Sequence, residues 1–173
     1  LLKREQKIAV KKILKHEMGV LVAPSGVGKT IIGIYAIAKR KTNTLILVHR
    51  KPLMEQWRTQ LATFLSIDLK DIGQIGGGKD DSNGILDVAM LQTMERKGIV
   101  DDRIANYGFI IADECHHISA VSFERVLMQA KSKICIRTYC YSVSSRWTPT
   151  DYSYAMRSNL LSYERKRRES TNY

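Results

Sequence analysis

Cysteine is scarce in this sequence of 173 residues, and its scarcity rules out several kinds of small domain. The three cysteines, Cys115, Cys135 and Cys140, are too few and too badly spaced for a disulfide framework or a four-ligand zinc site. Long apolar runs are also missing, and the N-terminal stretch LLKREQK has no signal-like apolar core. We therefore expect a cytoplasmic protein that does not enter the membrane.

Acidic residues are outnumbered by basic ones. The chain has 28 Lys and Arg against 17 Asp and Glu, which gives a formal net charge of +11. Such a charge favours a polyanionic partner such as nucleic acid, although a basic surface can also serve solubility alone. With 44% hydrophobic residues the chain can bury one sizeable core, so a single globular domain is the default expectation.

Two kinds of apolar segment alternate along the chain. Helices are expected at residues 5–16, 30–40 and 52–65, strands at 19–24, 44–50 and 107–117, a further strand from 85, and a loop at 75–84. Ile8, Val10, Ile13 and Leu14 have roughly helical spacing in the first helix, and Leu53, Trp57, Leu61 and Leu65 share one face of the third. Strands that are apolar on both faces and alternate with helices predict an α/β fold, with a mostly parallel sheet and helices on both faces.

The segment APSGVGKT, residues 23–30, joins a predicted strand to a predicted helix. Gly26 and Gly28 let the backbone curl so that its N–H groups point at phosphate oxygens, and the helix that follows adds its positive dipole end. Lys29 would reach the β- and γ-phosphates of ATP, and the Thr30 hydroxyl would ligate Mg²⁺. The predicted ATP-binding residues here are Pro24, Ser25, Gly26, Val27, Gly28, Lys29 and Thr30. Ala23 and Pro24 stand where the full pattern has glycine, and such a turn can also serve packing alone.

The segment IIADECHH, residues 110–117, is an apolar strand that ends in two carboxylates. In an open parallel sheet these lie at the carboxyl edge, where ligands bind. Asp113 would hold Mg²⁺ through its water shell, and Glu114 would orient or deprotonate the water that attacks the γ-phosphate. A zinc site at residues 115–117 is disfavoured, because three consecutive residues on one turn do not easily converge on one ion.

The order of APSGVGKT, LVHRKPLMEQW, IGGGK, VAMLQTM and DECHH resembles the first RecA-like domain of a superfamily 2 helicase or translocase. The likeness is to the D-E-x-H type related to restriction-enzyme motor subunits, and it covers residue 2 to about 133. It implies a RecA-like P-loop NTPase fold, the cofactors ATP and Mg²⁺, and nucleic acid as a partner, DNA in preference to RNA. It also implies a second RecA-like domain that supplies an arginine finger, for which this chain is too short.

The resemblance assigns further residues one by one. Gln6 matches a glutamine that reads adenine, and His116 matches a histidine that couples the ATP site to the following motif. Arg50 with the start of the next helix, and Gln92 with Thr93, match segments that touch a nucleic-acid backbone. Such contacts carry affinity without base specificity. For Gln6 and Arg50 a merely solvated surface position is the alternative.

In this family a motif close to G-L-T-A-T-P follows, and the chain has SKICIRTYCYSVSSRWTPTD (residues 132–151) instead. When residues 134–143 are written in permitted codons and the first base is dropped, the shifted frame reads Y-V-Y-G-L-T-A-T-P, and continuing it gives S-R-R-D-G. We therefore predict an ATP-binding domain at 1–133 and a frameshifted tail at 134–173. The alternative is a diverged extension that binds nucleic acid through Arg and Tyr side chains.

The start of this tail keeps a β-prone run, so it can still complete the sheet. Its alternation places Ile134, Ile136, Thr138 and Cys140 on one face and Cys135, Arg137, Tyr139 and Tyr141 on the other. A charged Arg137 is costly in a strand buried on both faces, so the strand is expected to lie at an edge, fray or turn Arg137 to solvent. The tail cannot supply the threonines of the missing motif, so His116 should lack its usual partner.

These observations predict the ATP-binding, potentially ATP-hydrolysing first motor domain of a nucleic-acid-dependent helicase or translocase. Asp113, Glu114 and Lys29 are its expected catalytic residues. Hydrolysis by the isolated chain should be very slow without the second domain. Two alternatives stay open: a catalytically idle nucleotide-binding fragment, and a P-loop ATPase that never meets nucleic acid.

Overall fold

The computed structural model describes residues 2–24, 26, 28–114, 120–130, 134–141 and 153–156. Its α-helices are α1 (Arg4–Lys15), α2 (Lys29–Arg40), α3 (Lys51–Leu65), α4 (Leu91–Met94) and α5 (Ala120–Gln129), with short 3-10 helices η1 (Leu69–Asp71) and η2 (Asp102–Asn106). Its strands are β1 (Met18–Pro24), β2 (Thr44–Val48), β3 (Gly73–Gly76), β4 (Lys79–Asp80), β5 (Leu86–Met90), β6 (Glu95–Arg96), β7 (Ile99–Val100), β8 (Phe109–Ala112), β9 (Ile134–Tyr141) and β10 (Ser153–Met156). In these segments no helix is long and apolar enough to cross a membrane.

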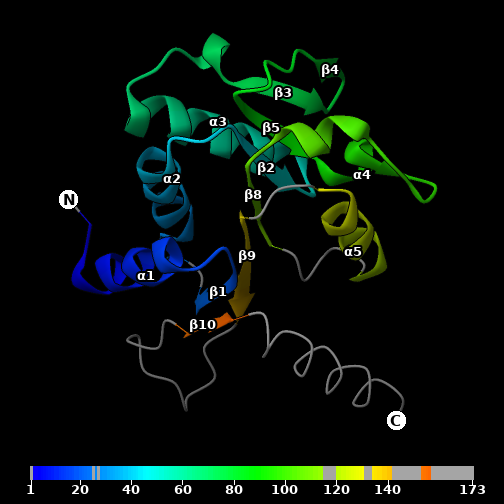
Figure 1. The fold of residues 1–173 in the computed structure, drawn as a ribbon. Helices are drawn as coiled ribbons and strands as arrows, with labels where there is room; N and C mark the ends of the chain where they lie inside the picture. Colours follow the sequence, from blue (N-terminus) through cyan, green and yellow to red (C-terminus); the bar gives the residue numbers. More distant parts are fainter. Residues whose placement is uncertain are drawn as a thin grey trace.

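Eight strands form one sheet in the order β10-β1-β9-β8-β2-β5-β3-β4. The six strands from β1 to β3 in this order are parallel to their neighbours, and β10 and β4 are antiparallel at the two edges. The mostly parallel sheet confirms the predicted fold class. Because β1 and β8 run the same way, the chain leaves both strands at the same edge of the sheet (Figure 1).

The sheet has an apolar core on each face. One core packs α1, α2 and α3 against the sheet, through fully buried residues such as Ile13, Ile32 and Trp57. The other packs residues of α4, η2 and α5 against the opposite face, including Met94, Ile104 and Val126. The predicted helices on both faces are therefore confirmed (Figure 1).

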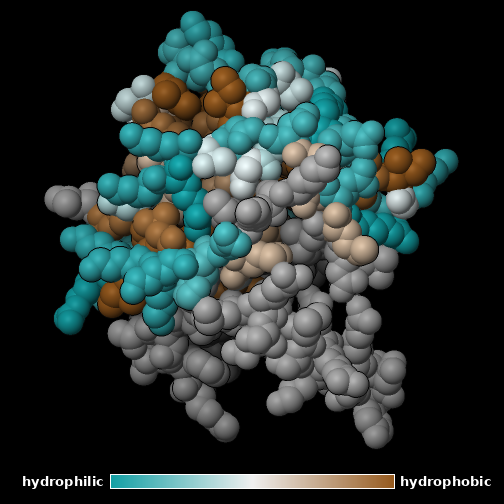
Figure 2. All heavy atoms as spheres, in the orientation of Figure 1, coloured by the Kyte–Doolittle hydropathy of each residue, from teal (hydrophilic) through white to brown (hydrophobic). Residues whose placement is uncertain are grey.

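Helix α1 places its apolar side on the sheet and its basic side in solvent. Lys7, Lys11 and Lys15 are exposed, and hydrophilic side chains dominate this part of the surface, at the lower left of Figure 2. Ile8, expected on the apolar side, is 49% exposed, because Gln6, Ala9, Val10 and Ile13 take the buried positions instead. Arg40 of α2 donates to the carbonyl oxygens of Ile13 and His16 at 2.7 and 2.8 Å, which satisfies C-terminal acceptors of α1 and joins the two helices.

Strand β9 lies in the interior of the sheet, between β1 and β8, so of the three alternatives expected for it the edge position is wrong. It is parallel to both neighbours, pairing Cys135 with Met18 and with Ile110. Cys135 and Ile136 are 3% and 2% exposed and belong to the cores on opposite faces, which confirms the predicted alternation. Ladder hydrogen bonds on both sides and burial of these side chains favour the interior position. The side chain of Arg137 lies outside the described residues.

Residues 75–84, predicted as a loop, contain part of a short hairpin. β3 pairs with β4 in antiparallel register, Ile75 opposite Asp80 and Gly76 opposite Lys79. Gly76, Gly77 and Gly78 have φ values of +99°, +67° and +93°, a conformation that residues with a Cβ rarely adopt. The run of three glycines therefore makes the tight turn that carries the chain from β3 into β4.

Candidate nucleotide-binding site

A cleft of about 330 Å³ opens at the carboxyl ends of β1 and β8. It is lined by Gly26, Gly28, Lys29, Thr30, Ile31, Leu53, Gln56, Gln60, Asp113 and Glu114. The strand carrying the glycine turn and the strand carrying the two carboxylates are separated only by β9. This topology brings two segments more than eighty positions apart onto one cleft.

Two glycines of the segment between β1 and α2 adopt the left-handed backbone conformation. Gly26 has φ +79° with nothing within 4 Å of an added Cβ, and Gly28 has φ +83°. α2 begins at Lys29, and its first turn closes through the Ile32 N–H, which donates to the Gly28 carbonyl at 3.1 Å. Lys29 and Thr30 are half-buried at this end of the helix. Pro24 ends β1, and Ser25 and Val27 lie outside the described residues.

Gln6 reaches the glycine turn from α1. It is 5% exposed, and its Oε1 accepts from the Lys3 N–H at 2.9 Å. A Cβ built on Gly28 would lie 2.6 Å from Gln6 Nε2, so the amide packs directly against the turn. Gln6 is therefore not a solvated surface residue, and Gly28 must lack a side chain for Gln6 to sit there.

Asp113 is held by donors on both carboxylate oxygens. Oδ2 accepts from the Trp57 indole N–H at 2.7 Å. Oδ1 accepts from the Glu114 N–H at 3.0 Å and from the Thr138 hydroxyl, which also lies 3.3 Å from the Glu114 nitrogen. Asp113 is 4% exposed, and its own N–H donates to the Leu47 carbonyl at 2.9 Å. The carboxylate is thus fixed in one orientation at the rim of the cleft.

Glu114 has a φ of +50°, in the left-handed region that non-glycine residues seldom occupy. Such a conformation persists only where surrounding contacts enforce it, and here its N–H is held by Asp113 and Thr138. The bend turns the chain at the end of β8 so that Asp113 and Glu114 both line the cleft. Cys115, His116 and His117 lie outside the described residues, so the coupling role predicted for His116 stays a prediction.

Six residues of the site were not assigned to it from the sequence, among them Ile31 and Leu53, which line the cleft. Trp57 was expected only as part of the apolar face of a helix, although a buried indole usually needs a hydrogen-bond acceptor, and that need was a usable signal. Gln56 and Gln60, from the same helix, line the cleft. Thr138 comes from the predicted tail, so no motif pointed to it.

The residues predicted to touch nucleic acid gather at the carboxyl ends of β2, β3 and β5. Arg50 is exposed at the N-cap of α3. Gln92 Nε2 donates to the His49 carbonyl oxygen at 3.0 Å, one residue before Arg50. Thr93 is exposed beside the turn of residues 76–78, since a Cβ on Gly76 would lie 2.4 Å from its Oγ1. We call Arg50, Gln92 and Thr93 the polar cluster.

Comparison with known proteins gives helicases and translocases as relatives. A family model described as type III restriction enzyme, res subunit, matches residues 1–138. The DNA 3'-5' helicase XPB of Kineococcus radiotolerans is 33% identical over 138 residues, which are 75% of this chain and 24% of that protein. The DNA 3'-5' translocase XPB2 of Sulfurisphaera tokodaii is 31% identical over 115 residues, 66% of this chain and 25% of that protein. The chain spans about a quarter of the length of these curated relatives.

The fold is also that of solved helicase structures. The crystal structure of UvsW from bacteriophage T4 matches with a TM-score of 0.67 and 18% identity, over 80% of this chain and 30% of that one. At this identity the likeness shows the fold alone, a RecA-like helicase domain.

Proposed function

Because this chain belongs to the type III restriction enzyme res-subunit family, as the first RecA-like domain of a superfamily 2 helicase or translocase, we propose that it binds Mg²⁺ and ATP and works on nucleic acid with a second such domain. One observation carries the proposal: a glycine turn, a lysine, a hydroxyl and two carboxylates converge on one cleft. These are the groups that phosphoryl transfer from ATP requires.

Each group has a distinct part in this proposal. The backbone around Gly26 and Gly28, with the N-terminus of α2, cradles the phosphates. Lys29 neutralises the β- and γ-phosphates. Glu114 orients the attacking water or takes its proton, because it follows Asp113 on the same turn at the rim of the cleft. Gln6 meets the adenine from the side of α1, since its amide already lies against Gly28.

The residues present fit a magnesium ion. Mg²⁺ is usually bound through one or two carboxylates together with substrate phosphates and water, not by a protein cage. Thr30 and Asp113 are the residues that would hold it, because a hydroxyl and a prearranged carboxylate face the same cleft. Across the described segments no group of three His, Cys, Asp or Glu residues converges. When bound, the ion would neutralise charge on the phosphates.

We infer that the polar cluster touches the nucleic-acid backbone. An exposed guanidinium, an amide and a hydroxyl suit phosphate oxygens, and the exposed residues Gly77 and Gly78 belong to the turn beside them. The excess of 11 positive charges would favour any such polyanion. DNA is proposed in preference to RNA, because the relatives quoted above are named as a DNA helicase and a DNA translocase; a mimivirus relative that is 32% identical is named as a putative RNA helicase.

The nucleotide half of this proposal is tested by Lys29→Ala, with Lys39→Ala as the matched control on the same helix. Removal of the ammonium that meets the phosphates should weaken Mg·ATP binding by about tenfold or more, measured by calorimetry with a non-hydrolysable analogue. Lys39 lies in the last turn of α2, near Tyr35, so its loss should leave affinity unchanged. Equal affinity of the Lys29→Ala variant and the unmodified chain would refute the assignment.

A further inference from the structure

The hydrogen bond between Trp57 and Asp113 connects α3 directly to the carboxylate of the cleft. The indole Nε1 lies 2.7 Å from Asp113 Oδ2, and the two residues are 0% and 4% exposed. An indole N–H is a donor only, so it can orient the carboxylate but cannot compete as a metal ligand. Donation to a carboxylate shielded from water is stronger than the same bond at the surface.

The indole ring has no freedom to move away. A Cβ added to Gly33 of α2 would lie 2.9 Å from Trp57 Cη2 and 3.6 Å from Cζ3, so the ring packs against the helix backbone at this glycine. The N–H on the other side of the ring is therefore directed at Asp113 by packing. Gly33 lies in the middle of α2, where no turn requires a glycine. The close approach of the Trp57 ring explains why this position has no side chain.

Helix α3 also touches the turn of residues 76–78, which lies beside the polar cluster. A Cβ on Gly77 would lie 2.7 Å from Met54 Cε and 3.6 Å from Lys51 Cγ. Arg50 occupies the N-cap position of α3, and Trp57 follows about two helical turns later. One rigid element thus has its N-terminus at the polar cluster and its middle on Asp113.

We propose that Trp57 is a positioning residue: it holds Oδ2 of Asp113 in the orientation that Mg·nucleotide binding needs, and it links that carboxylate through α3 to the polar cluster. The inference rests on the proposed function. Loss of the N–H leaves the buried Oδ2 without its donor, so that only the contacts of Oδ1 with Glu114 and Thr138 still hold the carboxyl group. Affinity for the magnesium complex should then fall, while affinity for nucleotide without metal should not.

The sharpest test replaces the indole N–H alone. In a Trp147→Phe background Trp57 is the only tryptophan, and it can be replaced by benzothienylalanine, which has the same shape with sulfur in place of N–H. Trp57→Phe is the genetically simpler variant. The affinity for ADP is measured with MgCl₂ and with EDTA. We expect the ratio of the two affinities to fall about tenfold in both variants, with the EDTA value unchanged.

Leu61→Val is the matched control. Leu61 is fully buried one turn further along α3, so its shortening loosens the same helix without touching Asp113. It should leave the magnesium ratio unchanged. A ratio that is unchanged in the Trp57 variants, or one that rises, overturns the positioning role. Failure of the unmodified chain to show any magnesium-dependent binding would instead refute the proposed function.

The link through α3 has its own spectroscopic readout. In the Trp147→Phe chain the indole emission reports Trp57 alone, and binding of a short DNA oligonucleotide without nucleotide should shift it. Binding without any shift overturns the link and leaves the carboxylate contact in place. No binding at all counts against the proposed nucleic-acid interface, not against Trp57.

Discussion

Arg50 is an exposed residue whose side chain is expected to contribute little to the stability of the fold. It stands at the N-cap of α3, yet its side chain makes no capping hydrogen bond. Pro52 lies in the first turn of the helix and favours helix initiation without that cap. Removal of the guanidinium should therefore change stability little, so any effect on nucleic-acid binding reports contact with phosphate.

We expect Arg50→Ala to weaken binding to DNA of any sequence and to lower the dependence of log affinity on log salt by about 0.7 to 0.9, the loss of one neutralised phosphate. Arg96→Ala is the control, because Arg96 is also exposed and lies in β6, outside the polar cluster. Fluorescence anisotropy over a salt series, with single- and double-stranded DNA and RNA, gives both slopes. Identical slopes for the two variants would exclude Arg50 from the interface.

Which residues the sequence could place depends on how locally their geometry is determined. Gly26, Gly28 and Lys29 lie within four positions of one another, so the motif itself dictates a turn with positive φ at the start of a helix. Trp57 meets Asp113 across 56 positions, and that contact depends on how α3 packs on the sheet. No local pattern encodes such a distance. The need of a buried indole for an acceptor could have raised the question but not the answer.

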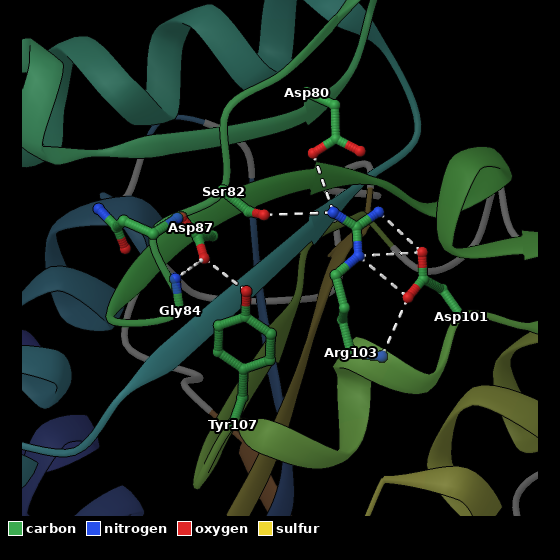
Figure 3. A network of polar contacts seen from close by, with 8 residues as sticks. Asp80, Ser82, Gly84, Asp87, Asp101, Arg103 and Tyr107 are labelled. Atoms are coloured by element: carbon green, nitrogen blue, oxygen red, sulfur yellow. Dashed lines mark hydrogen bonds and ion pairs between the residues drawn. The ribbon is translucent and has the colours of Figure 1, made fainter.

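Among the elements, the β3–β4 hairpin is held by a polar network below it (Figure 3). Arg103 of η2 donates to Asp80 at 2.9 Å, to Ser82 at 3.2 Å and to both carboxylate oxygens of Asp101. Asp87 accepts from the N–H groups of Asn83 and Gly84 and from the Tyr107 hydroxyl. The segment that follows the turn of residues 76–78 is thus anchored by side chains.

The contribution of the contact between Arg103 and Asp101 to the stability of the fold depends on the protonation of Asp101. The side-chain hydrogen bond from Arg103 lowers the pKa of Asp101 below its ordinary value of 3.8, and Asp101 in turn raises the pKa of Arg103. A carboxyl whose pKa is lowered by folding stabilises the fold above its unfolded pKa. That contribution is lost as the pH falls from about 4 through the folded pKa.

Arg103→Gln should therefore destabilise the chain by about 0.5 to 1.5 kcal/mol at pH 7, and by less at pH 3. Urea unfolding of both proteins at the two pH values measures the difference. Arg125→Gln is the control, since Arg125 makes one exposed ion pair, with Glu95 at 3.5 Å, and its removal should cost little at either pH. A cost for Arg103→Gln that is the same at pH 7 and pH 3 would contradict this account.

Elements with strong periodicity were predictable, and those set by pairing were not. The three helices at 5–16, 30–40 and 52–65 are present because apolar spacing decides a helix locally. The hairpin of β3 and β4 was predicted as a loop, since glycine-rich strands of two to four residues carry no alternation. For β9 the predicted alternatives were an edge strand, a frayed strand or a strand that turns Arg137 to solvent, and the interior position contradicts the first of these.

At the scale of the whole molecule, one sheet covered on both faces forms the RecA-like fold, and the chain spans about a quarter of the length of its relative from Kineococcus radiotolerans. The family match ends at residue 138, close to the boundary predicted at residue 133. Thr138, beyond that boundary, nevertheless contributes its hydroxyl to Asp113. The segment predicted to be read in a shifted frame thus still occupies a strand position, since a strand requires mainly a pleated, half-buried fit.

The prediction at this scale is that the rate of ATP hydrolysis depends on the reading frame of the tail. The isolated chain should hydrolyse ATP very slowly, because an arginine finger from a second domain contributes roughly 10³ to 10⁵ in rate in related phosphoryl-transfer enzymes. Deleting one base near the Lys133 codon should restore G-L-T-A-T-P and the downstream frame, and the longer product should show hydrolysis stimulated by nucleic acid. The same deletion combined with Lys29→Ala is the control and should give no stimulation. Close relatives whose genes encode Ile134 to Tyr173 in an intact frame would refute the shift, and brisk turnover by the isolated chain would refute the need for a second domain.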